Sequence, residues 1–462
     1  MRIARILSSP CQDRSGGHAP DIVIGPEVKE MDYRTLARLE SPSITLSNES
    51  MDLLWLSAGL LRLEELANRN PSDVYGELEI VVSDSNPWSD VNDPIEELLE
   101  LVLGMRVKVR VIEGKRSPMV EGQLPAKARS VVLFSGGVDS LAGILLARQK
   151  NESLVGVYVS HMSGVTGIVK RFESGVLREM RVPVLEFRLQ QTRRMLHQLR
   201  GFAYLISGIV AAKSVGAATL DVTECGVTMY QPTILANDVV TMTTHPRLIE
   251  LTLMIARRVL GRVPLVVRPF EDLTKAEVMA LCPEPALLAR THSCVSSQFS
   301  YALSSHCGTC WGCLIKEASA LVAGVGQPGW AKDVLRLDIG TEAGRRSGEK
   351  VTERSISDLL LLLDFSRHCL EDKLPWWTQS KIDEFGKGEL FRRFALDIYS
   401  SLHIVYGEGN TLARNRYAAK AYGEAIRKGL VTKDILENRI AEVRQKKWRP
   451  DFEWPSRAAN GL

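Results

Sequence analysis

The segment Ser135–Ser140, with the sequence Ser-Gly-Gly-Val-Asp-Ser, constrains the fold of this chain most. It lies between the apolar runs 130–134 and 141–147, which is the pattern of a strand, a glycine turn and a helix. Two glycines let backbone N–H groups approach an anion closely, and the new helix adds unpaired N–H groups at its first turn. The pattern predicts a phosphate-binding loop formed by Ser135, Gly136, Gly137, Val138, Asp139 and Ser140.

Asp139 is not expected to touch phosphate directly, because both groups are anionic; it braces the loop or helps to hold Mg²⁺. The loop lacks the lysine of a Walker A motif, so simple transfer of a γ-phosphate is not expected. The alternative interpretation is an ordinary glycine turn between a strand and a helix.

The rest of the chain predicts an α/β protein of several domains. With 462 residues, two or three domains are expected: an α/β extension over 1–125, a nucleotide-binding domain over 126–330 and a helical domain over 331–462. Helical patterns alternate with strand-like runs at 154–159, 182–187, 218–222 and 264–269, which is typical of a parallel, doubly wound sheet. Further strands are expected at 77–82 and 106–112, a linker at 114–128, and helices at 50–67, 94–103, 166–179, 202–215, 357–370, 381–400, 412–428 and 432–446.

Charge and hydropathy exclude few function classes. The net charge of +3 is close to neutral for this length, so a nucleic-acid partner is not indicated. No apolar run approaches the roughly 20 residues of a membrane-spanning helix, and Met1–Pro10 does not read as a signal peptide. We expect a cytoplasmic protein without a membrane partner.

Four cysteines gather near the end of the predicted nucleotide-binding domain. Cys307, Cys310 and Cys313 follow a C-x2-C-x2-C spacing, and Cys294 precedes them. Four thiolates can close a tetrahedral Zn²⁺ site, which is usually structural. A redox thiol pair and an iron–sulfur cluster are the alternatives, and His292 and His306 are possible substitute ligands.

The order of these motifs resembles the 7-cyano-7-deazaguanine synthase family, called QueC. The matching pieces are Ser135–Ser140, Arg200-Gly-Phe202, Leu273-Thr-Lys-Ala-Glu277 and Cys294 through Cys313, within about residues 128 to 325. The length of the chain and Thr243-Thr-His-Pro246 look more like the longer QatC-type members of antiphage-defence operons. The resemblance implies a Rossmann-like HUP-type ATP pyrophosphatase domain (PP-loop), bound Zn²⁺, and chemistry on a 7-deazaguanine carboxylate.

The resemblance also implies roles for single residues. Lys275 and Arg200 would bind phosphate, or in the case of Arg200 the substrate carboxylate, and would act with Asp139 and Ser140 in catalysis. Tyr158 ends a strand where this fold usually recognises adenine. The substrate candidates are Glu224, Thr244, His245 and Arg247. Glu224 could accept two hydrogen bonds from a guanine-like edge or only brace its loop, while Cys225 is a packed small residue or a sulfur carrier.

These features predict an ATP-dependent carbon–nitrogen ligase that adenylates a carboxylate, releases pyrophosphate and passes the acyl group to an amine. The amine is ammonia, as in queuosine precursor synthesis, or the amino terminus of a partner protein from the same operon. Two other classes remain open: a PP-loop sulfur transferase and a non-catalytic ATP-sensing subunit.

Overall fold

The structure is a computed structural model, and it describes most of the chain. The described residues are 2–7, 22–24, 31–35, 43–69, 75–114, 121–123, 127–150, 153–160, 175, 177–189, 198–230, 242–293, 307–308, 310–326, 335, 353–373, 386–407 and 415–446. The chain divides into two compact units. Unit 1 comprises Met1–Ser135, Asn151–Val222 and Val239–Val267, and unit 2 comprises Gly136–Lys150, Thr223–Asp238 and Arg268–Leu462.

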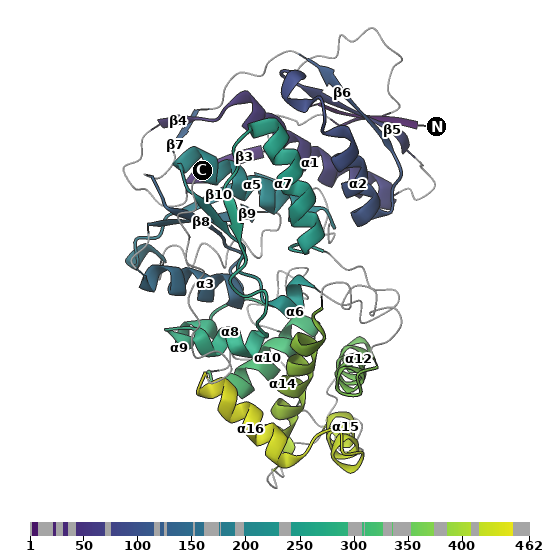
Figure 1. The fold of residues 1–462 in the computed structure, drawn as a ribbon, viewed down its shortest axis with the longest axis vertical. Coiled ribbons are helices and arrows are strands. Elements are labelled where there is room, and N and C mark those ends of the chain that lie inside the picture. The colour runs from purple at the N-terminus through teal and green to yellow at the C-terminus, as the bar shows by residue number, and fades with distance from the viewer. Residues whose placement is uncertain are drawn as a thin grey trace. The chain divides into compact units, whose positions relative to one another are not determined.

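Unit 1 contains a small parallel sheet near the N-terminus (Figure 1). Its order is β2-β1-β5-β6, from β1 (Arg2–Leu7), β2 (Ile22–Ile24), β5 (Tyr75–Val82) and β6 (Lys108–Glu113). The accompanying helices are α1 (Asn48–Arg69), the short 3₁₀ helix η1 (Asn86–Trp88) and α2 (Asn92–Leu103). The predicted strands and helices of this region are confirmed with shifts of a few residues at their ends.

The second sheet of unit 1 has, among the described strands, the order β12-β11-β8-β9-β10-β3. The parallel members are β8 (Ser130–Leu133), β9 (Leu154–Ser160), β10 (Val184–Leu189), β11 (Thr219–Asp221) and β12 (Leu265–Val267). Chain order therefore reverses between β8 and β11, as in doubly wound nucleotide-binding folds. Helix α5 (Arg200–Val215) packs on β8 and β9, and α7 (Pro246–Leu260) packs on α5. The predicted α/β fold with a parallel sheet is confirmed.

Several strands of the N-terminal region were not predicted, among them β1 and β2 of the first sheet. Strand β3 (Met31–Thr35) runs antiparallel to β10 at the edge of the second sheet. Strands β4 (Ser43–Thr45) and β7 (Glu121–Gln123) pair with each other, so part of the predicted linker over 114–128 is a strand.

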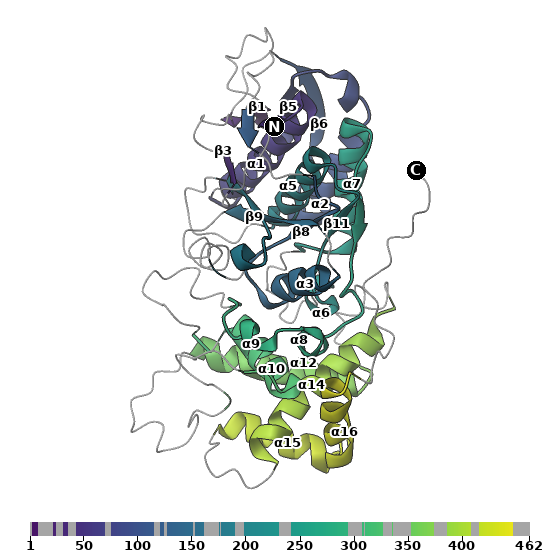
Figure 2. The ribbon, with the colours of Figure 1, turned by 90° about the vertical axis from the view of Figure 1, so that its left-hand side faces the viewer.

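Unit 2 is helical in its described part (Figure 2). It contains α3 (Val138–Gln149), α6 (Gly226–Met229), α8 (Lys275–Leu281), α9 (Pro285–Leu288) and α10 (Trp311–Ala323). The C-terminal helices are α12 (Glu353–Leu370), α14 (Gly388–Tyr406), α15 (Arg416–Arg427) and α16 (Lys433–Arg444), which confirms the predicted helical region.

The core of this helical region is apolar and partly aromatic. Phe365 of α12 meets Phe391 of α14 edge to face, with ring centroids 6.0 Å apart. Phe391 and Phe394 are fully buried, so α14 supplies the centre of the bundle. The predicted helix over 166–179 lies mostly outside the described residues. Within the described chain, no helix is both long and apolar enough to cross a membrane.

Candidate functional site

The predicted phosphate loop joins β8 to α3. Gly136 has φ +77°, in the left-handed region that glycine adopts without strain, and Gly137 is the N-cap of α3. The Gly136 carbonyl accepts the His292 N–H at 2.9 Å, and Ser140 Oγ donates to the Gly137 carbonyl at 3.2 Å. Ser135 is exposed, whereas Asp139 and Ser140 are buried. Strand order puts this loop after the central strand β8, where ligands bind in sheets of this kind.

An ion pair joins the first turns of two helices in unit 2. Lys275 is the first residue of α8, and its ammonium nitrogen lies 2.6 Å from Asp139 Oδ2 in the first turn of α3. The Cys225 N–H donates to the same oxygen at 3.3 Å. Burial alone would lower the pKa of Lys275, but Asp139, with Cys225 and Glu224, raises it above its ordinary value. Lys275 therefore stays charged. Its ammonium group, on the first residue of α8, binds the Asp139 carboxylate in the first turn of α3.

Glu224 lies in the same cluster, and its carboxyl group has a raised pKa. Burial raises its pKa to about 7; the nearby Asp139 carboxylate also raises it, whereas Lys275 lowers it. Asp139 Oδ1 is buried and receives no hydrogen bond from the described residues. Oδ2 already accepts from Lys275 and Cys225, so Oδ1 is the Asp139 oxygen that is left for a cation such as Mg²⁺.

Cys225 is poorly suited to carry sulfur. Its side chain is fully buried and its Sγ lies 2.8 Å from Thr228 Oγ1. Burial, together with the Asp139 carboxylate, raises the pKa of the thiol to about 12. A thiol in this state is neutral near pH 7, whereas the thiolate is the nucleophile in sulfur chemistry.

Gly226 lets the chain that carries Glu224 lie against the turn before Lys275. Its N–H donates to the Phe270 and Leu273 carbonyls at 2.9 and 3.0 Å. A Cβ atom on Gly226 would overlap the Glu271 carbonyl oxygen, so any other residue would push the two segments apart.

The other predicted site residues lie in unit 1. Arg200 begins α5, and its Nε donates to Thr243 Oγ1 at 3.1 Å. A Cβ atom on Gly201 would overlap the Thr243 backbone, which explains the glycine in the Arg200-Gly-Phe202 motif. The structure therefore brings Arg200 to the predicted substrate loop.

The residues after Thr243 are mostly engaged in local structure. Thr244 and His245 are buried, and His245 Nδ1 caps α7 by accepting the Arg247 N–H at 3.3 Å. Arg247 Nε donates to Glu97 at 3.0 Å and its Nη1 to Glu250 at 2.5 Å, which raises the pKa of Arg247. Tyr158 is buried on β9. The guanidinium of Arg247 is thus already bound to two carboxylates, and a substrate would have to displace them.

Lys316 lies close enough to Lys275 for their charges to interact, and the sequence motifs did not indicate it. It is 1% exposed, and its ammonium donates to the Thr291 carbonyl at 2.5 Å. Burial lowers its pKa to about 7; the charge of Lys275 lowers it further, whereas Cys313 raises it. The available signal was a Lys-Glu pair inside the otherwise apolar helical run 311–323.

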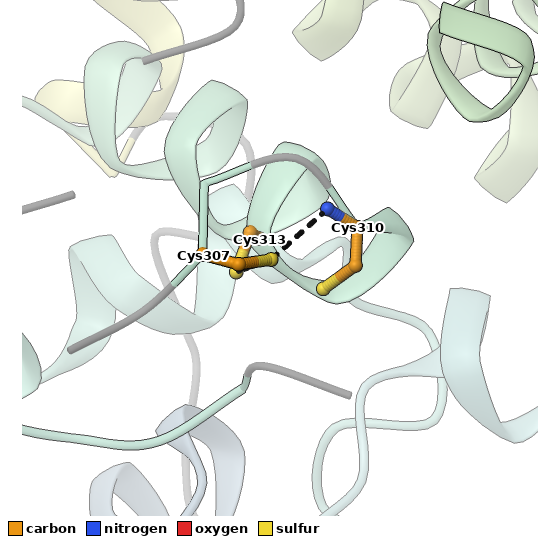
Figure 3. A group of neighbouring side chains, drawn as sticks. All are labelled: Cys307, Cys310 and Cys313. Carbon is orange, nitrogen blue, oxygen red and sulfur yellow. Dashed lines mark hydrogen bonds between the residues drawn. The ribbon is translucent and has the colours of Figure 1, made fainter. Parts of the chain in front are cut away.

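Three of the four predicted zinc ligands come together at the start of α10 (Figure 3). The sulfurs of Cys307, Cys310 and Cys313 all lie within 4.8 Å of one another, and Cys307 Sγ is 3.9 Å from Cys313 Sγ. Tetrahedral zinc with Zn–S bonds of about 2.3 Å separates its sulfurs by about 3.8 Å. The Cys310 N–H also donates to Cys307 Sγ at 3.4 Å. The three cysteines fit a zinc site; Cys294 lies outside the described residues.

Comparisons with known proteins leave the family open. No protein-family model and no curated protein matches the chain. Among solved structures, it is similar to the "Crystal structure of a 4-thiouridine synthetase - RNA complex with bound ATP", with 16% identity and a TM-score of 0.25. The match covers 54% of this chain and 69% of that chain.

Proposed function

We propose that this protein is an ATP-dependent carbon–nitrogen ligase of the PP-loop type. It adenylates a 7-deazaguanine carboxylate, releases pyrophosphate and forms an amide with an amine, in the setting of antiviral defence. The sequence resemblance to QueC-like proteins supports the substrate class, and the cluster around Asp139 and Lys275 supports the use of ATP.

The observation that carries the proposal is the Lys275–Asp139 contact of 2.6 Å. It brings the N-termini of α3 and α8 together beside a glycine loop and a buried ammonium group. The N-terminus of α3 has no side-chain cap, so it presents unpaired N–H groups and a partial positive charge, and anions bind readily at such ends; α8 contributes the Lys275 ammonium group. A departing pyrophosphate is the anion that this arrangement would stabilise best.

The proposed reaction has two steps. A carboxylate oxygen attacks the α-phosphorus of ATP. The bond between the α-phosphorus and the oxygen that bridges it to the β-phosphorus breaks, and pyrophosphate leaves. The amine nitrogen then attacks the acyl carbon, the bond to AMP breaks, and the amine loses a proton to solvent. The loop residues 135–140 would orient the phosphates, Lys275 would stabilise charge on the leaving group, and Asp139 would hold Lys275 in place.

Two metals have separate places in this proposal. Zn²⁺ would be held by Cys307, Cys310 and Cys313 with Cys294, where it cross-links the chain. Mg²⁺ would approach Asp139 Oδ1, and when bound it would neutralise phosphate charge. Asp139 is held by its contacts with Lys275 and Cys225, and Cys307 accepts the Cys310 N–H.

Pyrophosphate release tests the activity. Wild-type protein with ATP, Mg²⁺ and 7-carboxy-7-deazaguanine should release pyrophosphate, and Lys275→Met should reduce the rate by about 10²–10³. Lys433→Met is the matched control, because Lys433 is also the first residue of a helix but is exposed. Equal rates for both variants, or no release from the wild type, would refute the proposal.

We favour a protein amino terminus over ammonia as the acceptor, because large parts of the chain lie outside the QueC-like segment, and stable protein interfaces bury about 1,600 Å². Intact-mass analysis of operon partners after incubation with enzyme, ATP and 7-carboxy-7-deazaguanine decides this point. A partner that gains one amide-linked deazaguanine supports conjugation. Unmodified partners with free 7-cyano-7-deazaguanine in the presence of ammonia indicate the conventional synthase, and thiolated product indicates a sulfur transferase.

A further inference from the structure

The start of α8, which carries Lys275, is held by residues far along the chain. The helix has only seven residues, so it depends on contacts with the rest of unit 2 for its position. Its N-terminus has a capping box: Glu277 N–H donates to Thr274 Oγ1 at 3.3 Å, and Thr274 N–H donates to Glu277 Oε2 at 2.9 Å. Glu277 is 0% exposed, which is unusual for a capping carboxylate and requires further partners.

Those partners are two arginines of the C-terminal helices. Arg439 of α16 donates to Glu277 Oε1 at 2.7 Å, and Arg393 of α14 donates to the same oxygen at 3.0 Å. Arg439 Nε also donates to Asp397 Oδ1 of α14 at 2.8 Å. Arg439 Nη1 donates in addition to Glu442 Oε2 on its own helix at 3.2 Å. The two guanidinium groups thus contact two buried carboxylates and the more exposed Glu442, and Glu277, Asp397 and Arg439 are all at most 3% exposed.

Apolar and backbone contacts act on the same turn. Ala276, beside Lys275, packs in a buried cluster with Val322 of α10 and Val443 of α16. Val443 lies four residues after Arg439, so one face of α16 contacts both residues that follow Lys275. Arg393 Nη2 donates to the Asp272 carbonyl at 2.6 Å, which holds the turn before α8 as well.

A buried ion network of this kind is weak support for stability alone, because desolvation offsets much of the attraction. It does fix geometry, since each guanidinium donates along defined directions. We propose that Arg439 and Asp397 are positioning residues, which hold the first turn of α8 so that Lys275 stays at Asp139. This inference rests on the proposed role of Lys275 and assigns the C-terminal helices a part in that site.

Chemical labelling tests the inference without relying on activity. Lys275 is 12% exposed and ion-paired, so acetic anhydride should modify it slowly compared with Lys433, as read by peptide mass spectrometry. Arg439→Met should accelerate labelling of Lys275 relative to Lys433. Arg439→Lys retains the charge but cannot donate to Glu277 and Asp397 in the same geometry as the guanidinium group. Its rate of Lys275 labelling should therefore lie between those of the wild type and Arg439→Met. Arg444→Met is the control, because the Arg444 guanidinium of α16 donates to the Leu321 and Val322 carbonyls of α10.

Kinetics of pyrophosphate release give the second readout. A displacement of a positioned group by about 1 Å can reduce turnover about 100-fold. We expect Arg439→Met to lower kcat by about that factor with little change in the KM for ATP, while Arg444→Met keeps kcat. Asp397→Asn is the milder variant if Arg439→Met does not fold. Unchanged Lys275 labelling in folded Arg439→Met and Asp397→Asn proteins would overturn the inference. If labelling rises but Lys275→Met keeps full activity, the proposed function fails and the positioning holds.

Discussion

The ammonium nitrogen of Lys275 and the carboxylate of Asp139, 136 positions apart in the chain, lie 2.6 Å from each other. Their side chains are 12% and 5% exposed, so the pair is largely removed from water. Removing either partner leaves the other charge buried without its counter-ion.

The Lys275–Asp139 pair should show strong coupling in stability. Lys275→Met and Asp139→Asn should each lower the free energy of unfolding by about 3–5 kcal/mol, because each leaves a buried group unpaired. The double variant should lose less than the sum, with a coupling of about 0.5–3 kcal/mol. Urea unfolding of the four proteins measures the cycle. Additive losses would show that the two side chains do not interact in solution.

Glu224 should make stability depend on pH. Burial, followed by the Asp139 carboxylate, raises its pKa from 4.5 to about 7. The stabilisation that comes from the protonated form is complete below about pH 4.5 and is lost as pH rises through about 7. Wild type should therefore lose about 1–3 kcal/mol relative to Glu224→Gln between pH 5 and pH 8.

Urea unfolding at the two pH values, in buffer without added Mg²⁺, checks this difference. Glu389→Gln, on an exposed position of α14, serves as the control and should follow the wild type. A Glu224→Gln profile parallel to that of wild type contradicts the prediction.

The cysteine cluster should contain one zinc per chain. Cys310→Ser should lose the metal and lower the melting temperature, because structural zinc contributes to the free energy of folding. Elemental analysis and thermal unfolding measure both effects. Cys369→Ser, at a buried cysteine of α12 outside the cluster, should keep its zinc. Metal-free wild type with freely alkylated Cys307, Cys310 and Cys313 would exclude a zinc site.

Gly201 should not tolerate a methyl group. A Cβ atom there would overlap the Thr243 backbone, so Gly201→Ala must displace the start of α5 or the loop. We expect a loss of about 1–3 kcal/mol in the free energy of unfolding. Gly388→Ala, where a Cβ atom meets nothing within 4 Å, is the matched control and should change little. Equal stabilities of the two variants would contradict the observed close approach.

Local patterns predicted the parts of the molecule that local physics determines. The strand, glycine turn and helix around Ser135–Ser140 appeared where the apolar runs placed them, because burial and glycine geometry act within a few residues. The C-x2-C-x2-C spacing likewise predicted a cluster that a single turn and the start of α10 can form. Motif order placed Lys275 at a helix start, but it did not reveal that Asp139 is its partner.

The parts that escaped prediction depend on long-range contacts. Arg439 and Glu277 are 162 residues apart, and nothing near either residue indicates the other. Strand β3 was missed because a five-residue strand with alternating charge resembles a loop, and its pairing with β10 is decided by the sheet edge. Lys316 was missed because charge in a helix ordinarily faces water, whereas here it faces a carbonyl group.

The pairing of β3 with β10 has a consequence for any shortened form of this protein. A chain that begins at residue 126 would keep every loop and cysteine motif but would lose β3, and the outer edge of β10 would then present unpaired N–H and C=O groups. Exposed edges of this kind recruit strands from other molecules. Such a fragment should self-associate through β10. In the full chain, β3 covers this edge and should reduce aggregation.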